Sequence, residues 1–421
     1  MPVLKNKIAN AKNIFSNNKK VAENYFFMTS LQIAGSLIGL LIYPYVIRTL
    51  GTSTYGLYVF ANSVVSYFII FISFGFTYPA LKAISQNPND VRAKNEVVSC
   101  IFTAKVYMSI LALAVYGCLL AVIPLFRQNI YLFAICFAQI IPEILFPQWY
   151  FQGVQKMNIV TYIQVFFRVL TIPFIFIFVK KPSDLYVYAI ITVSAVVLSS
   201  LVCVVYMRLK ENISFYFVSF KKQKKYFQAA LPFFLSNSAG TIKEESVTLL
   251  IGSFFNMHDV ALYDLANKII SIPRMFTMNI NKAIFPKFIQ NIQTKESIKK
   301  IIRYEAFIGF SIMLLIAIFG YWAVLFVGEE MLLSYPLSII LSSTIIVWLV
   351  VGCYINYIFI PQEKYYYVTR NQLVAFFSFF LFCIPTLFIF KSIYTVVLAL
   401  ALSGFCEILY CKYIVKKNNY L

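Results

Sequence analysis

Charged residues and histidine are scarce in this 421-residue chain. Asp, Glu, Lys and Arg make up 12% of it, about half of the usual share in a soluble protein. His258 is the only histidine, which excludes a histidine-based metal cluster. The eight cysteines form no C-x-x-C pair and lie almost entirely in apolar runs. We therefore expect them to pack as small apolar side chains rather than to form disulfides or metal sites.

Motifs of soluble enzymes are also missing. The sequence has no G-x-S-x-G, no glycine-rich phosphate loop and no carboxylate pair in a loop. We expect no catalytic residue, no cofactor and no metal. The 36 basic residues outnumber the 16 acidic ones and give a net charge of +20. They separate apolar runs and form no basic domain, which argues against nucleic acid as a partner.

Apolar sequence, in contrast, is abundant. Apolar residues make up 61% of the chain, and the mean hydropathy is +0.78. A helix that crosses a bilayer needs about 20 such residues. Twelve runs meet this requirement, at about 26–47, 55–77, 97–123, 129–150, 160–179, 185–207, 227–254, 260–281, 304–327, 332–354, 366–389 and 393–415. The sequence therefore predicts an all-α polytopic membrane protein with twelve transmembrane helices.

The distribution of basic residues predicts the orientation of these helices. If the amino terminus is cytoplasmic, 26 Lys and Arg residues fall in inner loops and termini and five in outer loops, with five more inside spans. Such an excess is typical of the cytoplasmic side of membrane proteins. We expect both termini in the cytoplasm.

A short internal repeat divides the chain. Residues 57–62 (LYVFAN) in the second span resemble residues 262–267 (LYDLAN) in the eighth. Six spans separate the copies, so both run in the same direction. This pattern indicates two parallel six-helix halves around a central cavity, as in many transporters. The predicted domains are 1–207 and 226–421, joined by a lysine-rich cytoplasmic linker at 208–225.

Charged residues inside spans are costly and mark candidate functional sites. The seventh and eighth spans each place polar residues at helical spacing, which predicts two polar faces along a wet cavity. Asp264 and Lys268 are one turn apart and are expected to pair. Lys105 is expected to reach the membrane surface, and Glu407 has no evident partner. The acidic candidates for ion pairing or coupling are Glu143, Glu244, Glu245 and Asp264.

Three motifs lie where predicted spans meet loops. They are Arg48-x-Leu50-Gly51-x-x-x-Tyr55-Gly56-x-Tyr58, then Pro142-Glu143 with Pro147-x-Trp149-Tyr150-Phe151-Gln152-Gly153 and Lys156-Met157, and Tyr263-x-x-Ala266-x-Lys268-Ile269. Together with the twelve-span layout, they resemble bacterial polysaccharide flippases of the multidrug/oligosaccharidyl-lipid/polysaccharide exporter superfamily. Two departures bear on the subfamily. The two extra spans of lipid II flippases are absent, and the charges in the spans are of both signs, whereas the drug exporters rely on acids.

The resemblance implies a flippase in the bacterial cytoplasmic membrane. It would translocate undecaprenyl-diphosphate-linked oligosaccharide repeat units by alternating access, for O-antigen or capsule synthesis, with polysaccharide polymerase machinery as a further partner. A diphosphate and a large polar head cannot cross about 30 Å of hydrocarbon unaided. The cationic candidates for binding the diphosphate or acidic sugars are Arg48, Lys243, Lys268 and Arg274.

Two alternatives remain open at this point. One is a cation-coupled multidrug exporter of the same superfamily, in which Glu244, Glu245 and Asp264 bind the cation or proton. The other is a membrane-embedded polysaccharide polymerase or ligase. Such enzymes usually need a sizeable outer loop, and the predicted outer loops are short.

Overall fold

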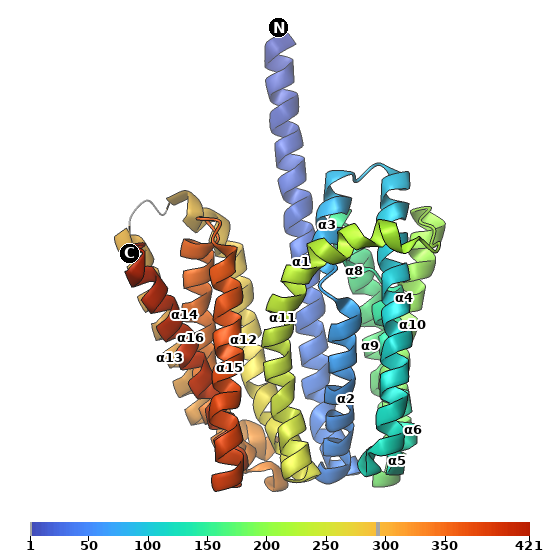
Figure 1. Cartoon of the computed structure of the whole chain (residues 1–421), viewed down its shortest axis with the longest axis vertical. Helices are drawn as coiled ribbons and strands as arrows, with labels where there is room; N and C mark the ends of the chain where they lie inside the picture. The colour runs from blue at the N-terminus through green and yellow to red at the C-terminus, as the bar shows by residue number, and fades with distance from the viewer. Residues whose placement is uncertain (1, 292–294) are drawn as a thin grey trace. The chain divides into compact units, whose positions relative to one another are not determined.

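The structure is a computed structural model that describes the backbone of residues 2–291 and 295–421. It describes their side chains except those of residues 2–19, 21, 22, 279, 280 and 282–291. Every regular element in these ranges is a helix (Figure 1). The first part of the chain forms α1 (Pro2–Leu50), α2 (Thr52–Ser73), α3 (Thr77–Gln86), α4 (Val91–Val122), α5 (Pro124–Gln128), α6 (Ile130–Phe137), α7 (Ile140–Leu145), α8 (Gln148–Gly153), α9 (Met157–Phe178), η1 (Pro182–Asp184) and α10 (Leu185–Lys210).

The second part begins with two long helices. It forms α11 (Phe220–Phe254), α12 (Met257–Asn291), α13 (Lys295–Val327), η2 (Glu329–Met331), α14 (Ser334–Tyr354), the π-helical turn η3 (Ile355–Phe359), α15 (Tyr365–Ile389) and α16 (Ile393–Lys417). The all-α membrane fold predicted from the sequence is thus confirmed.

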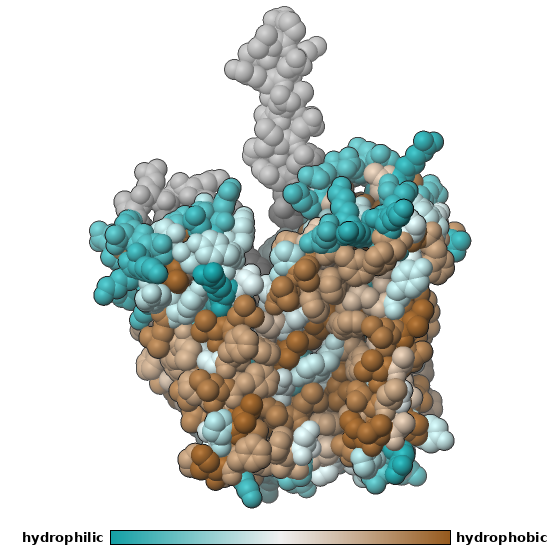
Figure 2. All heavy atoms as spheres, viewed as in Figure 1, coloured by the Kyte–Doolittle hydropathy of each residue, from teal (hydrophilic) through white to brown (hydrophobic). Residues whose placement is uncertain are grey.

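Ten segments within the described ranges are long and apolar enough to cross a membrane. They match ten of the twelve predicted spans. The other two predicted spans correspond to α11 and α12, which have 35 residues each but carry more charge. On the face shown in Figure 2, hydrophobic residues cover the middle of the helices, and hydrophilic residues gather near their ends. Large apolar side chains such as Phe319, Trp322 and Leu381 are exposed, as expected for residues that contact lipid.

The fourth predicted span, 129–150, matches a candidate span over Ile130–Gly153, but it is not one continuous helix. The structure divides this stretch into α6, α7 and α8. Phe146 and Pro147 leave the helical conformation, with φ, ψ of −98°, 103° and −85°, 80°. A proline disfavours the helical conformation of the residue before it, so Pro147 accounts for the break between α7 and α8. In α8 the side chains of Trp149, Tyr150 and Phe151 are buried, and α8 packs against α3.

The described chain divides into two compact units. The first comprises residues 1–39, 71–177 and 188–233, and the second comprises 40–70, 178–187 and 234–421. In the first unit, the extended residues 211–219 bind α4, where Asn95, Ser99 and Thr103 hydrogen-bond to their backbone. In the second unit, α14 packs against α12, α13 and α16, and α15 packs against α16.

Candidate functional site

A polar cavity of 720 Å³ lies within the second unit. Its wall includes the polar face of α11, with Ser236, Asn237, Gly240, Thr241, Lys243 and Glu244, and the Arg274 and Asn281 side chains of α12. Residues of α14, η3, α15 and α16 complete it, among them Trp348, Asn356, Tyr357, Gln372 and Glu407. The sequence predicted from the spacing of polar residues that α11 and α12 both line a cavity, and both helices do so. The structure adds three further helices to it.

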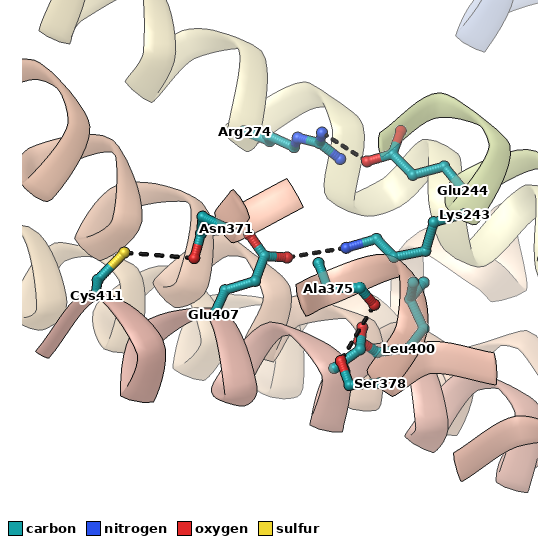
Figure 3. A network of polar contacts seen from close by, with 10 residues as sticks. Lys243, Glu244, Arg274, Asn371, Ala375, Ser378, Leu400, Glu407 and Cys411 are labelled. Carbon is teal, nitrogen blue, oxygen red and sulfur yellow. Dashed lines mark hydrogen bonds and ion pairs between the residues drawn. The ribbon is translucent and has the colours of Figure 1, made fainter. Parts of the chain in front are cut away.

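Lys243 forms a buried ion pair at the cavity wall. Its Nζ donates to Oε1 of Glu407 at 2.9 Å, and both residues are buried, at 8% and 7% exposure. The other carboxylate oxygen, Oε2, accepts from Asn371 Nδ2 at 3.1 Å, and Asn371 Oδ1 accepts from the thiol of Cys411 at 3.4 Å. Figure 3 shows this chain of contacts linking α11, α15 and α16. The partner of Glu407, which was not evident from the sequence, is thus Lys243, 164 residues away along the chain.

A second ion pair lies in the more open part of the cavity. Nη2 of Arg274 donates to Oε1 of Glu244 at 3.1 Å (Figure 3). The guanidinium carbon of Arg274 is 3.6 Å from the ring centroid of Trp348, in a cation–π contact. The Arg274 and Glu244 side chains are 20% and 46% exposed. This pair is therefore more accessible than the Lys243–Glu407 pair.

Asp264 and Lys268 form the predicted ion pair on α12. Neither residue lines the cavity. The Tyr55 hydroxyl, on α2, donates to Oδ2 of Asp264 at 3.0 Å and accepts from Nζ of Lys268 at 3.2 Å. Nζ of Lys268 also lies 4.8 Å from the ring centroid of Tyr43. These contacts connect α1, α2 and α12 within the second unit.

Glu143 belongs to the first unit and is paired there. Nζ of Lys105 donates to Oε1 of Glu143 at 2.5 Å and to its backbone carbonyl at 2.8 Å. Lys105 is buried at 5% exposure, so the expectation that it extends to the membrane surface is wrong. Lys105 also lines a small hollow together with Pro147, at the break between α7 and α8.

The remaining two candidates, Arg48 and Glu245, do not line the cavity. Arg48 donates to the backbone carbonyls of Val327 at 3.1 Å and Phe326 at 2.7 Å, at the carboxyl end of α13. A cation at this end of a helix is favourable because the last carbonyls carry partial negative charge. Glu245 is half-buried and forms no ion pair with any side chain that the structure describes.

Three residues were not among the predicted site residues: Glu407 and Trp348, which line the cavity, and Asn371, which is buried and hydrogen-bonds to Glu407. Glu407 gave a signal, because an acidic residue in an apolar span needs a cation nearby. Its partner could not be chosen from the sequence, where Lys243, Lys268 and Arg274 are equally available. Nothing in the sequence singled out Asn371 beyond its polar side chain, or Trp348 beyond its large one.

Comparison with known proteins gives one family and several relatives. The family model described as "Polysaccharide biosynthesis protein" matches residues 21–292. A protein of Escherichia coli (strain K12) named "Putative O-antigen transporter" is 22% identical over 308 residues, which cover 72% of this chain and 74% of that protein. A protein of the same name from Shigella dysenteriae is 22% identical over 395 residues, covering 88% and 94%.

Solved structures share the fold at low identity. The lipid II flippase MurJ in an inward closed conformation has a TM-score of 0.67 at 12% identity, covering 92% of this chain and 87% of that one. An outward-facing multidrug resistance transporter of the MATE family and the MOP superfamily has a TM-score of 0.60 at 13% identity, covering 95% and 96%. These structures support the fold and leave the substrate to be argued from the site.

Proposed function

The chain belongs to the polysaccharide biosynthesis protein family and is a flippase of the multidrug/oligosaccharidyl-lipid/polysaccharide superfamily, and from this premise we propose what it carries and how. The substrate is an undecaprenyl-diphosphate-linked oligosaccharide repeat unit. The protein moves it across the bacterial cytoplasmic membrane by alternating access, for O-antigen or capsule synthesis. The product is then available to a polymerase at the outer face.

The observation that carries this proposal is the charged cavity of the second unit. Lys243 and Arg274 line 720 Å³ of space in a chain that is otherwise strongly apolar. Charges at membrane depth cost several kcal/mol by most estimates, so those that line a cavity are candidates for contact with a substrate. A cavity of this kind suits a headgroup with phosphates and hydroxyls, because cations and amides bind both.

We propose that the two ion pairs act in different ways. The Arg274–Glu244 pair is partly exposed, so a diphosphate can replace the Glu244 carboxylate on Arg274 at little cost. The Lys243–Glu407 pair is buried, so separating its two charges costs more free energy. Arg274 would therefore be the first cation to meet the substrate, and Lys243 would respond when helices rearrange. For Lys268 and Arg48 we propose structural roles, since both are occupied by protein partners outside the cavity.

Alternating access requires two bodies that move against each other. We propose the parallel halves 1–207 and 226–421 for this role, as the internal repeat indicates, with both termini in the cytoplasm. The polar head would travel in the central cavity while the prenyl chain stays in lipid. The physical reason is that the head requires hydrogen-bonding groups at every depth, and the chain requires none.

The multidrug exporter alternative is less well supported. It needs carboxylates that are free to bind a cation or proton. Glu244 and Asp264 each form an ion pair, with Arg274 and Lys268. Only Glu245 among these three acids lacks one within the described side chains.

One experiment separates the two functions. The gene is deleted in its host, and surface polysaccharide and the lipid-linked repeat unit are measured together with resistance to cationic dyes. We expect loss of surface polysaccharide, accumulation of the lipid-linked repeat unit and unchanged dye resistance. Increased dye sensitivity with normal surface polysaccharide would contradict the proposal and favour the exporter.

A further inference from the structure

A second hollow in the second unit differs from the polar cavity in its location and composition. It has a volume of 660 Å³ and lies over α14, between α13 and α16. Its lining is mostly apolar, and its basic residues are Lys299 and Arg303 of α13 and Lys412 of α16. The apolar lining residues are Ile302, Ala306, Ile346, Val350, Phe405, Ile408 and Leu409. We call this hollow the basic groove.

Two glycines near the groove allow α13 and α16 to approach α14 closely. A Cβ at Gly309 of α13 would lie 2.9 Å from Cα of Ile346, and a Cβ at Gly404 of α16 would lie 2.9 Å from Cγ2 of Val347. Both outer helices therefore touch α14 closely at this level. From there the groove runs along α13 from Ala306 to Lys299, about 10 Å at 1.5 Å per residue.

The three cations gather at the same end of the groove. Nζ of Lys295 donates to the backbone carbonyl of Asn419 at 2.6 Å, which joins the start of α13 to the chain just beyond α16. Lys299 and Arg303 follow on the first turns of α13, and Lys412 lies on the last turns of α16. The groove thus has an apolar body and a positively charged mouth.

These cations have no protein counter-ion. Lys299, Arg303 and Lys412 are exposed, and none forms an ion pair with a described side chain. The residues whose side chains are not described contain no Asp or Glu, so no carboxylate partner lies among them. Lys300, on another side of α13, is paired with Glu296 at 3.3 Å. Lys299 and Arg303, which line the groove, form no such pair.

We propose that the basic groove binds an anionic phospholipid with two phosphates, of the cardiolipin type. The phosphates contact Lys299 and Arg303 on one wall and Lys412 on the other, and the upper parts of the acyl chains fill the apolar body. A headgroup with two phosphates can contact both walls at once and brings two negative charges to three cations, whereas a headgroup with a single phosphodiester brings one. Basic pockets between transmembrane helices on the cytoplasmic side recognise such lipids, and the basic-residue bias predicts that side for this end of α13.

The bound lipid would link α13 to α16 across α14. This proposal does not depend on the transported substrate, because the groove and the polar cavity share no basic residue. The basic groove is about 10 Å long, which is less than the roughly 15 Å of hydrocarbon in one leaflet. The groove therefore holds the headgroup end of the lipid and leaves the chain ends in the bilayer.

The test measures binding of fluorescent cardiolipin to the purified full-length protein in detergent. The site variant combines Lys299→Gln, Arg303→Gln and Lys412→Gln. A control variant with the same loss of charge combines Lys300→Gln, Lys416→Gln and Lys417→Gln. We expect each single change in the groove to weaken binding about fivefold and the triple site variant about a hundredfold. The control variant should bind within about threefold of the wild type, since its lysines do not line the groove.

A second variant tests the apolar body without changing charge. Ala306→Phe fills the groove and should weaken cardiolipin binding about fivefold, with thermal unfolding recorded to confirm that the variant is folded. Equal loss of binding in the site and control variants would overturn the proposal. Binding of phosphatidylcholine to the wild type as tightly as cardiolipin would also overturn it. Displacement of cardiolipin by an equal concentration of undecaprenyl diphosphate would overturn it too and would identify the groove as a substrate site.

Discussion

Three cations in the membrane-spanning helices of the second unit are held by carboxylates of the protein. Lys243 is held by Glu407, Arg274 by Glu244 and Lys268 by Asp264. The pairs differ in burial, and burial determines the cost of separating them. A buried pair that loses one member leaves an unpaired charge, at about 3–5 kcal/mol. An exposed pair contributes little, about 0–1 kcal/mol.

The Lys243–Glu407 pair gives the first prediction. Lys243→Met should destabilise the protein strongly, because Glu407 remains buried without its cation. Adding Glu407→Gln should restore most of the loss, since the neutral amide can still accept the Asn371 hydrogen bond. Thermal unfolding of the purified variants measures both effects and their coupling. If the single and double variants melt at the same temperature, the pair does not stabilise the fold.

The Asp264–Lys268 pair gives a second prediction, with Tyr55 as its probe. Tyr55→Phe removes the hydroxyl that hydrogen-bonds to both charges and keeps the ring. It should lower the free energy of unfolding by about 1 kcal/mol and leave transport near the wild-type rate. Thermal unfolding and surface polysaccharide measure the two effects. Loss of transport without loss of stability would instead place this cluster in the transport pathway.

At the scale of helices, local contacts were predictable and distant ones were not. The Asp264–Lys268 pair follows from spacing within one helix, and the polar faces of α11 and α12 follow from helical period. The Lys243–Glu407 and Lys105–Glu143 pairs depend on how helices pack, which spacing does not determine. The break in the fourth span follows from Pro147, but the sequence alone also allows a kinked continuous helix.

The structure also explains the motif Arg48-x-Leu50-Gly51-x-x-x-Tyr55-Gly56 in physical terms. Arg48 binds the last carbonyls of α13, and Tyr55 binds the Asp264–Lys268 pair. Gly56 lies so close to α12 that a Cβ would overlap the carbonyl oxygen of Met257. The motif therefore joins α1 and α2 to α12 and α13, which fits the structural role proposed above for Arg48.

The close contact at Gly56 gives a third prediction. Gly56→Ala should destabilise the protein by about 1–3 kcal/mol, because the backbone of α12 has to shift. Gly117→Ala is the matched control, since no atom lies within 4 Å of a Cβ there. Thermal unfolding of the purified proteins compares them. Equal melting temperatures for the two variants would show that α2 and α12 do not approach as closely as the structure indicates.

At the scale of the whole chain, membrane topology is the fourth prediction. The excess of basic residues on one side predicts that Ser183 faces the outside and Asn212 the cytoplasm. The native cysteines are first replaced by serine or alanine, and a single cysteine is then placed at each position. A membrane-impermeant thiol reagent labels these variants in intact and in lysed cells. Ser183→Cys should label in both and Asn212→Cys only after lysis. Labelling of Ser183→Cys only after lysis would contradict the twelve-span arrangement.

The most direct test of the proposed cavity is flipping of a fluorescent undecaprenyl-diphosphate oligosaccharide in vesicles that contain the purified protein. Arg274→Ala should slow flipping about tenfold or more, because the diphosphate loses a charge-assisted hydrogen bond. Glu244→Gln should flip at close to the wild-type rate, because it removes only the carboxylate that competes for Arg274. Glu244→Gln should be nearly as stable as the wild type, because its ion pair is partly exposed, and Arg274→Ala should lose about 1 kcal/mol with its contact on Trp348. Wild-type flipping by Arg274→Ala would contradict the assignment of this cavity to the substrate.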